Sequence, residues 1–405
     1  MRKIRVLQVV TRLVRRGVPR HVLDMATHLN PARFEVEILA GTGEPWEGSL
    51  WEEAREKGLL THRVPSLQRA INPFRDAVAF GAIYRKIRSG RYDVVHTHIS
   101  KAGFLGRLAA RRARVPAVVH TYHGRIEELN PESLKGRVLA ACERRAARAS
   151  DALVGVSEEE VRQKRSARLG REEQFHVIHG GIDLDRFTQT RKWERPAEMM
   201  RGPVIGTIGT LTREKGLDLL IEVLPSTVLR HPELQLCIVG AGPMEAGLRA
   251  QAEHLGVAKS VHFSGCVEDV RPWLAAFDLL AQPSRSEALS LAVLEAMAMG
   301  VPVVATDVGG MAEAVEDGVT GKLVPAGDSA ALAAALNELL SDRSGLEELG
   351  LAGRARARKF SVSRSAELLG ELYERLLGEG SSPRGTGVGA LAGSGAPAAP
   401  ESLIP

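Results

Sequence analysis

Cysteine, aromatic side chains and long apolar runs are all scarce in this sequence. The three cysteines (Cys142, Cys237 and Cys266) are isolated, and neither a CxxC pair nor a histidine cluster at metal-ligand spacing accompanies them. This pattern argues against a disulfide framework or a zinc site and indicates a reducing, cytoplasmic compartment. Aromatic residues make up 4% of the chain, too few for the stacking platforms of nucleic-acid-binding proteins. We therefore expect no bound metal and no nucleic-acid partner.

Apolar runs stay short throughout the chain. None approaches the roughly 18–20 residues that a membrane-spanning helix needs. The N-terminal segment MRKIRVLQVV starts with positive charge, but its apolar run soon meets Thr11, Arg12, Arg15 and Arg16. It predicts a first β-strand rather than a signal peptide.

Positive charge is concentrated in one half of the chain. Residues 1–190 carry 34 Lys and Arg against 22 Asp and Glu, a surplus of 12 positive charges, whereas residues 191–405 carry 20 against 27. Two interpretations stay open. Either the N-terminal half contacts something anionic, such as the inner face of a membrane or a phosphorylated acceptor, or its arginines occupy solvated helix faces.

The length of 405 residues suggests two domains, and apolar periodicity indicates that both are α/β. In the first half the expected strands are 4–10, 34–39, 93–96, 117–121, 152–156 and 175–178, with a short extended piece beginning at Val64, alternating with helices at 20–29, 49–57, 73–88, 101–112 and 136–149. In the second half the expected strands are 204–209, 234–239, 261–263, 279–282 and 302–306, with helices at 216–230, 244–255, 270–276, 311–316 and 329–340 and one ending at Gly300. This alternation predicts two doubly wound, Rossmann-like domains facing a central cleft, where ligands bind outside the carboxyl ends of the strands.

Composition places the domain boundaries. The polar, aperiodic segment 187–202 is the expected linker between domains 1–186 and 203–360. Residues 361–377 predict an amphipathic helix that packs back on the N-terminal domain. The Gly/Ala/Pro/Ser-rich residues 378–405 predict a disordered tail.

Two carboxylates stand out in SRSEALSLAVLEAMAMG (284–300). Glu287 lies in a polar loop, whereas Glu295 lies in an apolar helix, where a charge is costly unless something satisfies it. Glu295 could accept hydrogen bonds from two adjacent ribose hydroxyls, and helix-start amides around Ala288–Ser290 could face a diphosphate or sugar hydroxyls. The alternative is a buried glutamate satisfied by the backbone or by an arginine.

The loop GTIGTLTREKG (206–216) joins an expected strand to a helix and carries Arg213 and Lys215. Amides at the helix start and two cations would form a phosphate cradle; the alternative is a plain loop with surface cations. The P-loop pattern GxxxxGK[ST] is absent from this loop. In VGAGP (239–243) a short GxG follows an expected strand, but the dinucleotide motif GxGxxG fails at Glu245, which disfavours a nicotinamide-dependent dehydrogenase.

Four histidines follow two expected strands in HTHISKAG and HTYHG. His96 and His120 fall on strand bodies and are expected to be satisfied core residues. His98 and His123 are candidates for hydrogen bonding or acid–base chemistry, with His123 first. The basic loop Arg12–Gly17 either faces the same cleft or forms a solvated turn.

Taken together, these motifs resemble those of the retaining, nucleotide-sugar-dependent glycosyltransferases of family 4, which have the GT-B fold. The resemblance spans about residues 4–375. Residues 283–300 and the following VPVVATDVGG resemble the signature PSxxEGFGxxxxEAMAxGxPVVAT, and VIHGGIDLDRF (177–187) resembles the hinge VIPNGIDxxxF. Lys215 matches the lysine of GRLxxxKG, and His123 matches the histidine that contacts the donor sugar.

The resemblance implies a role for each matched residue. Glu295 would bind the nucleotide ribose, Glu287 and His123 would position the donor sugar, and Lys215 and Gly17 would contact the diphosphate. These cations and amides would replace a metal, so no metal cofactor is implied.

Several donor-site positions depart from the family pattern. EGFG is here EALS, so Ala288–Ser290 bring side chains to a glycine-bearing loop. Thr210 replaces the arginine of GRL, and Arg16 replaces the first glycine of a Gly-Gly loop. We hypothesise that Arg213 supplies the cation missing at Thr210.

The sequence therefore predicts a retaining glycosyltransferase, a hexosyl- or N-acetylhexosaminyltransferase. Its donor would be a nucleoside-diphosphate sugar, with a UDP-sugar as the first expectation, bound by the C-terminal domain. The N-terminal domain would bind a hydroxyl acceptor, lipid-linked in one hypothesis, in the synthesis of bacterial envelope, exopolysaccharide or glycolipid. The alternative is a sugar-nucleotide-binding protein without catalysis.

Overall fold

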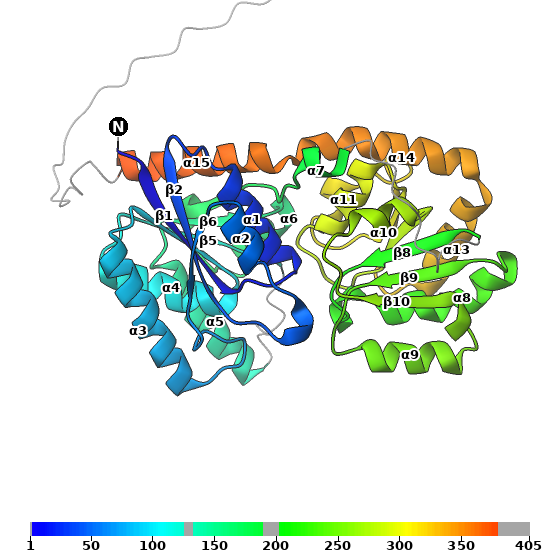
Figure 1. Ribbon diagram of the computed structural model, residues 1–405, viewed down its shortest axis with the longest axis horizontal. Helices are drawn as coiled ribbons and strands as arrows, with labels where there is room; N and C mark the ends of the chain where they lie inside the picture. The colour runs from blue at the N-terminus through cyan, green and yellow to red at the C-terminus, as the bar shows by residue number, and fades with distance from the viewer. Residues whose placement is uncertain (1, 125–132, 189–201, 380–405) are drawn as a thin grey trace, which may run out of the picture.

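Two parallel sheets organise the computed structural model, which describes residues 2–124, 133–188 and 202–379 (Figure 1). The first sheet has seven strands in the order β3-β2-β1-β4-β5-β6-β7, and the second has six in the order β10-β9-β8-β11-β12-β13. Neighbouring strands pair in parallel in both sheets. The expected fold, two doubly wound α/β domains, is confirmed.

The N-terminal sheet is close to its prediction. Its strands are β1 (Ile4–Arg12), β2 (Phe34–Gly41), β3 (Leu60–Arg63), β4 (Val94–His98), β5 (Ala117–Thr121), β6 (Ala152–Gly155) and β7 (Phe175–Val177). Its helices are α1 (Gly17–His28), α2 (Trp51–Glu56), α3 (Pro73–Gly90), α4 (Ser100–Ala113), α5 (Leu134–Ala147), α6 (Glu158–Ser166) and α7 (Leu184–Thr188). Strand β3 ends just before Val64, where a short extended piece was expected to begin. The sequence misplaced it because this edge strand is mostly polar and partly exposed and carries no apolar alternation.

The C-terminal sheet repeats the same plan. Its strands are β8 (Val204–Ile208), β9 (Gln235–Val239), β10 (Val261–Gly265), β11 (Leu279–Gln282), β12 (Val303–Thr306) and β13 (Lys322–Val324). Its helices are α8 (Leu217–Arg230), α9 (Glu245–His254), α10 (Arg271–Ala276), α11 (Leu291–Met299), α12 (Met311–Ala314), α13 (Ser329–Ser341) and α14 (Arg343–Ala357).

Helix α14 was not predicted from the sequence, because three glycines interrupt it and glycine disfavours helix formation. The structure explains one of them. A Cβ on Gly350 would lie 2.3 Å from the carbonyl oxygen of Gly300, so only glycine allows α14 to approach the end of α11 this closely.

The last helix, α15 (Val362–Glu379), runs back over the N-terminal domain, whereas α14 lies over the C-terminal domain (Figure 1). It packs against α1. Its buried residues join the core formed by β1, β4, β5 and β6, namely Val362, Ala366, Leu369, Leu372 and Tyr373. Most of the expected linker (189–201) and tail (380–405) lies outside the described residues, and no described helix has the length and apolarity needed to cross a bilayer.

A second connection joins the domains near the cleft. Ile182, just before α7, donates to the carbonyl of Phe360 at 2.9 Å and accepts from the amide of Val362 at 2.9 Å. The carboxylate of Glu313 on α12 accepts from the amides of Glu158 and Glu159 at 2.9 Å each. These contacts hold the carboxyl ends of the two sheets opposite each other.

Candidate functional site

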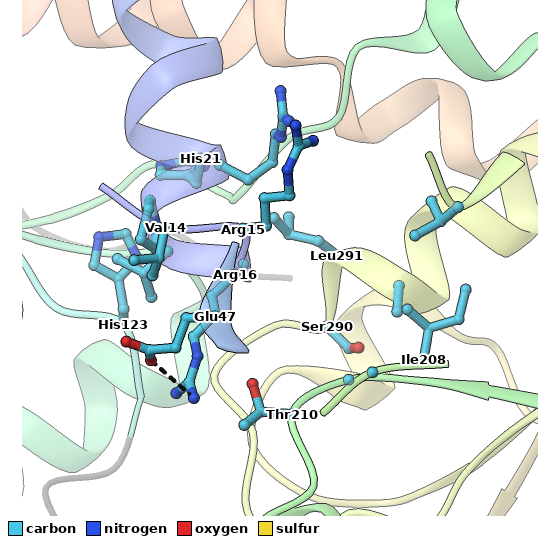
Figure 2. A pocket seen from close by; sticks show the side chains of 18 of the residues that line it. Val14, Arg15, Arg16, His21, Glu47, His123, Ile208, Thr210, Ser290 and Leu291 are labelled. Atoms are coloured by element: carbon cyan, nitrogen blue, oxygen red, sulfur yellow. Dashed lines mark ion pairs between the residues drawn. The ribbon is translucent and has the colours of Figure 1, made fainter. Parts of the chain in front are cut away.

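A cavity of about 520 Å³ separates the two domains. Its walls are segments that follow all seven strands, β1 to β7, of the N-terminal sheet and strands β8, β9, β10 and β11 of the C-terminal sheet. In both sheets the strand order reverses at this edge, between β1 and β4 and between β8 and β11. Doubly wound proteins bind ligands at such switch points. Figure 2 shows side chains from both walls pointing into the space.

On the C-terminal wall, Lys215 and Glu287 form an ion pair. The same carboxylate oxygen of Glu287 accepts a 2.8 Å hydrogen bond from the hydroxyl of Ser284. Lys215 ends a 3₁₀ turn at Arg213–Lys215 that follows β8. The predicted phosphate loop and the predicted acidic loop therefore lie together at the cleft.

Close backbone contact holds these two loops together. Gly216 has a φ of 64°, and a Cβ there would lie 2.0 Å from the carbonyl oxygen of Pro283, so a side chain would push the loops apart. Arg285 adds a bidentate pair with Asp218, at 2.6 and 2.7 Å. These contacts fix the two loops that carry Lys215 and Glu287 relative to each other.

Glu295 lies on α11 and lines the cleft. Within the described residues it has no hydrogen-bond or ion-pair partner. Burial raises its pKa to about 7, against the opposing effect of the Arg186 and Arg20 guanidiniums. The expected alternative, in which the backbone or an arginine satisfies Glu295, is therefore not seen in the described part of the chain.

The start of α11 differs from expectation. The helix begins at Leu291, with Ser290 as its N-cap, so the free helix-start amides belong to Leu291–Val293 rather than to Ala288–Ser290. Ala288, Leu289 and Ser290 do line the cleft, but as the loop before the helix. A Cβ on Gly309 would lie 1.8 Å from the carbonyl oxygen of Glu287, so the segment after β12 supports this loop closely.

Thr210 and Gly17 also line the cleft, on opposite walls. A Cβ on Gly17 would meet nothing within 4 Å, so open space adjoins the start of α1. Arg213 behaves differently from its neighbour Lys215. It is exposed and does not line the cleft, because residues of a 3₁₀ turn point in different directions.

The predicted histidines form a buried chain of hydrogen bonds. His123 lines the cleft, and its Nε2 lies 3.0 Å from Nδ1 of His98. His98 Nε2 donates to Gln8 at 2.7 Å, Gln8 donates to the hydroxyl of Tyr373 at 3.2 Å, and this hydroxyl lies 2.5 Å from His96. Because His98 carries its proton on Nε2, its Nδ1 accepts from His123.

Burial dominates the chemistry of these histidines. It lowers the pKa of His96 to about 3 and that of His21 to about 4, and it holds those of His98, His120 and His123 well below the usual range. All five are neutral near pH 7. His96 and His120 are satisfied core residues, as expected, while His98 supports His123 from behind instead of facing the cleft itself.

Sequence reasoning missed His21 and Arg186. His21 lines the cleft from α1, edge-on to the ring of His123 at 5.3 Å between centroids, with its buried Nδ1 unpaired among the described residues. Arg186 lines the cleft from α7 and acts electrostatically on Glu295. His21 could have been found from the sequence, because it is a histidine on the apolar face of α1. Arg186 lies in the expected hinge segment, where no sequence signal distinguishes it.

The described ranges contain no group of three or more His, Cys, Asp or Glu side chains arranged to hold a metal ion. Metal independence remains a prediction.

Comparison with known proteins places this architecture. Residues 15–186 match the family described as Glycosyltransferase Family 4, and residues 202–342 match the one described as Glycosyl transferases group 1. A D-inositol 3-phosphate glycosyltransferase of Nocardia farcinica is 34% identical over 319 residues, which are 74% of this chain and 70% of the relative.

Solved structures agree on the fold. Sucrose-phosphate synthase from Thermosynechococcus elongatus superposes with a TM-score of 0.77 at 22% identity, over 93% of this chain and 100% of that one. HepE of Anabaena, in complex with UDP-glucose, gives a TM-score of 0.76 at 22% identity, over 92% of this chain and 100% of that one. The fold is GT-B, and the chain belongs to glycosyltransferase family 4.

Proposed function

We propose that the protein transfers a sugar from a nucleoside diphosphate to a hydroxyl acceptor, with retention of configuration, and that a UDP-sugar is the donor. One observation carries the proposal: Glu295 is a cleft-lining carboxylate without a protein partner in the described chain. Two adjacent ribose hydroxyls would supply the donors it lacks. HepE, which shares the fold, was solved with UDP-glucose, and this supports the choice of donor.

The other predicted side chains find places around such a donor. Lys215 would stabilise negative charge on the diphosphate. Glu287, held by Lys215 and Ser284, would accept hydrogen bonds from sugar hydroxyls. His123 would contact the sugar from the opposite wall, as a neutral imidazole whose orientation His98 fixes.

The reaction itself is a displacement at the anomeric carbon. The bond from this carbon to the diphosphate oxygen breaks, and the electron pair goes to the diphosphate. The acceptor oxygen bonds to the same face of the carbon, and its proton passes to an oxygen of the leaving diphosphate. Excluding water from the cleft would limit hydrolysis of the donor.

A thermal-shift screen against nucleotide sugars and nucleoside diphosphates tests the donor. Stabilisation grows as RT ln(1 + [L]/Kd), so a UDP-sugar should raise the melting temperature above all other classes. Release of UDP on adding an acceptor extract would then separate an enzyme from a non-catalytic sugar-nucleotide binder. Binding without release would favour the binder.

We further propose that the acceptor is lipid-linked and met at an anionic membrane, in envelope or exopolysaccharide synthesis. Ile71, just before α3, is 68% exposed, and Phe74 and Val78, in the first two turns of α3, are 87% and 60% exposed. Arg75, Arg85 and Arg88 lie on the same helix. Apolar side chains beside basic ones are typical of interfacial helices.

Vesicle sedimentation tests this contact. Wild-type protein should sediment with anionic vesicles at low salt, and the paired substitution Phe74→Ser and Val78→Ser should weaken sedimentation. Substitution of Leu229 and Leu351 by Ser is the control, because these residues are 84% and 69% exposed on the C-terminal domain. If wild-type protein does not sediment with the vesicles at low salt, the proposed membrane contact is wrong.

A further inference from the structure

We infer that Arg16, on the N-terminal wall, supplies the cation for the donor diphosphate that the C-terminal loop lacks at Thr210. The inference rests on the proposed function and deepens it, because it assigns diphosphate recognition to both domains. It replaces the hypothesis that Arg213 supplies this charge, since Arg213 is exposed and does not line the cleft.

The backbone directs Arg16 into the cleft. Arg16 is the N-cap of α1 and has an extended conformation, with φ −139° and ψ 162°. Its side chain is 19% exposed, pairs with Oε1 of Glu47 at 2.9 Å and lies over the ring of Trp46 at 4.9 Å. Figure 2 shows it reaching into the cleft, with Thr210 and Ser290 on the opposite wall.

Glu47 does not neutralise Arg16 fully, because it also forms an ion pair with Arg12. The guanidinium of Arg12 approaches both carboxylate oxygens of Glu47, at 2.6 and 2.5 Å. One fully buried carboxylate therefore faces two guanidiniums, and the group keeps a positive charge. Burial lowers the pKa of Arg16, and the neighbouring guanidiniums of Arg12 and Arg69 lower it further against the opposing Glu47. A bound anion would relieve this repulsion.

The opposite wall has little free positive charge of its own. Thr210 is uncharged, and Lys215 already pairs with Glu287. A diphosphate bound there would need a further cation, and Arg16 comes from the facing wall with side-chain N–H groups not used by Glu47. The space beside Gly17 is open. The first hydrogen bond of α1 runs from the amide of Arg20 to the carbonyl of Arg16 at 2.9 Å, so the amides before Arg20 have no partner within the helix. Diphosphate oxygens could therefore also bind at this helix start.

Recognition from two domains has a consequence for the reaction. When the sugar–oxygen bond breaks, the electron pair moves onto the diphosphate, and Arg16 would stabilise this charge only while the cleft is closed. Arg15, the preceding residue, already reaches across the cleft to Glu268 at 3.3 Å. Closure and leaving-group stabilisation would therefore occur together.

Calorimetric titration of the full chain with UDP, uridine and inorganic pyrophosphate tests the inference. Arg16→Gln, which removes the charge and keeps a shorter polar side chain, should weaken UDP and pyrophosphate binding at least tenfold and leave uridine binding unchanged, because one charge-assisted interaction is lost. Adding Thr210→Arg to this variant should restore most of the UDP affinity from the other wall. Arg213→Ala is the matched control and should bind all three probes like wild type.

The outcomes are distinct. Wild-type UDP affinity in Arg16→Gln, or an equal loss for uridine and UDP, would overturn the inference while leaving the donor proposal standing. A wild-type protein that binds no nucleoside diphosphate would overturn the proposed function itself. If Arg16→Gln does not fold, Arg16→Met, which also removes the charge, decides: a tenfold loss confined to UDP and pyrophosphate supports the assignment, and unchanged binding rejects it.

Discussion

The two walls of the cleft are both polar, but they satisfy their polar groups differently. On the N-terminal wall, Arg12 and Arg16 share Glu47, and His123 is tied to His98 and the chain behind it. On the C-terminal wall, Glu295 has no partner within the described residues. Among the described residues, the N-terminal wall pairs most of its polar groups with one another, with Nδ1 of His21 as an exception, whereas the C-terminal wall leaves the carboxylate of Glu295 open.

This difference matters because a preorganised group costs little to position, while an unsatisfied buried carboxylate raises the free energy of the ligand-free state. The C-terminal wall therefore gains most when a ligand arrives. It is the wall that we expect to bind the donor first, with the N-terminal wall closing onto it.

The largest expected effect concerns charge on the C-terminal wall. Lys215→Ala should lower kcat by about a hundredfold to a thousandfold, because the leaving diphosphate loses a preorganised cation. Arg213→Ala, two residues away on the exposed side of the same turn, should leave kcat unchanged. Steady-state kinetics with the identified donor measures both. Equal losses in the two variants would mean that the loop, rather than the cleft-facing charge, matters.

The second prediction concerns Glu295 and pH. Its pKa of about 7 lies above its ordinary 4.5, so between these values the folded protein holds a proton that the unfolded chain has released. The free energy of unfolding should therefore fall as pH rises from 4.5 to 7, by up to about 3 kcal/mol from this group.

Comparison with Glu295→Gln isolates that contribution, because the histidines titrate equally in both proteins. In urea unfolding at several pH values, the free energy of unfolding of Glu295→Gln should increase relative to that of wild type as pH rises. At pH 8 the variant should be at least as stable as wild type. In wild type, UDP affinity should increase with pH towards 7, because ribose hydroxyls bind the ionised carboxylate. Parallel stability curves would show that Glu295 has a partner after all.

The third prediction tests how complete the N-terminal wall is. Tyr373→Phe removes the hydroxyl that joins Gln8 to His96, leaving buried polar atoms unpaired at a cost of about 1–3 kcal/mol in the free energy of unfolding. Loosening this chain should also lower kcat a few-fold, because His98 then holds His123 less firmly.

Tyr92→Phe is the matched control. The hydroxyl of Tyr92 is also buried and donates to Glu37 at 2.6 Å, but it lies away from the cleft. It should lose stability without losing kcat. If kcat falls equally in the two variants, the histidine chain does not position the cleft residue.

Much of the C-terminal wall was predictable because its signals are local. An acid within an apolar helix, as at Glu295, and a glycine-bearing loop ending in Lys215 can be seen within a few residues of sequence. Parallel α/β patterning then requires that both lie at the same sheet edge. The doubly wound fold followed from the same periodicity.

The N-terminal wall was less predictable because its partners are distant in sequence. No sequence feature near Arg12 or Arg16 predicts that Glu47 is their partner. Tyr373 lies 365 positions from Gln8, which it contacts. The side on which Arg213 points depends on the turn geometry after β8, which charge patterning does not encode.

The smallest expected effect concerns a direct ion pair between the walls, Arg15 to Glu268 at 3.3 Å. Glu268 is 90% exposed, so solvent screens the pair and each side chain loses freedom on pairing. A double-mutant cycle with Arg15→Ala and Glu268→Ala should give a coupling below about 1 kcal/mol in urea unfolding. The coupling should fall at high salt, as it should for the exposed pair Arg249–Glu245 within α9. A coupling of several kcal/mol that persists in salt would mean that the walls are already locked together without ligand. The N-terminal wall would then cover the C-terminal wall before the donor binds, and the proposed order, donor binding first and closure second, would be wrong.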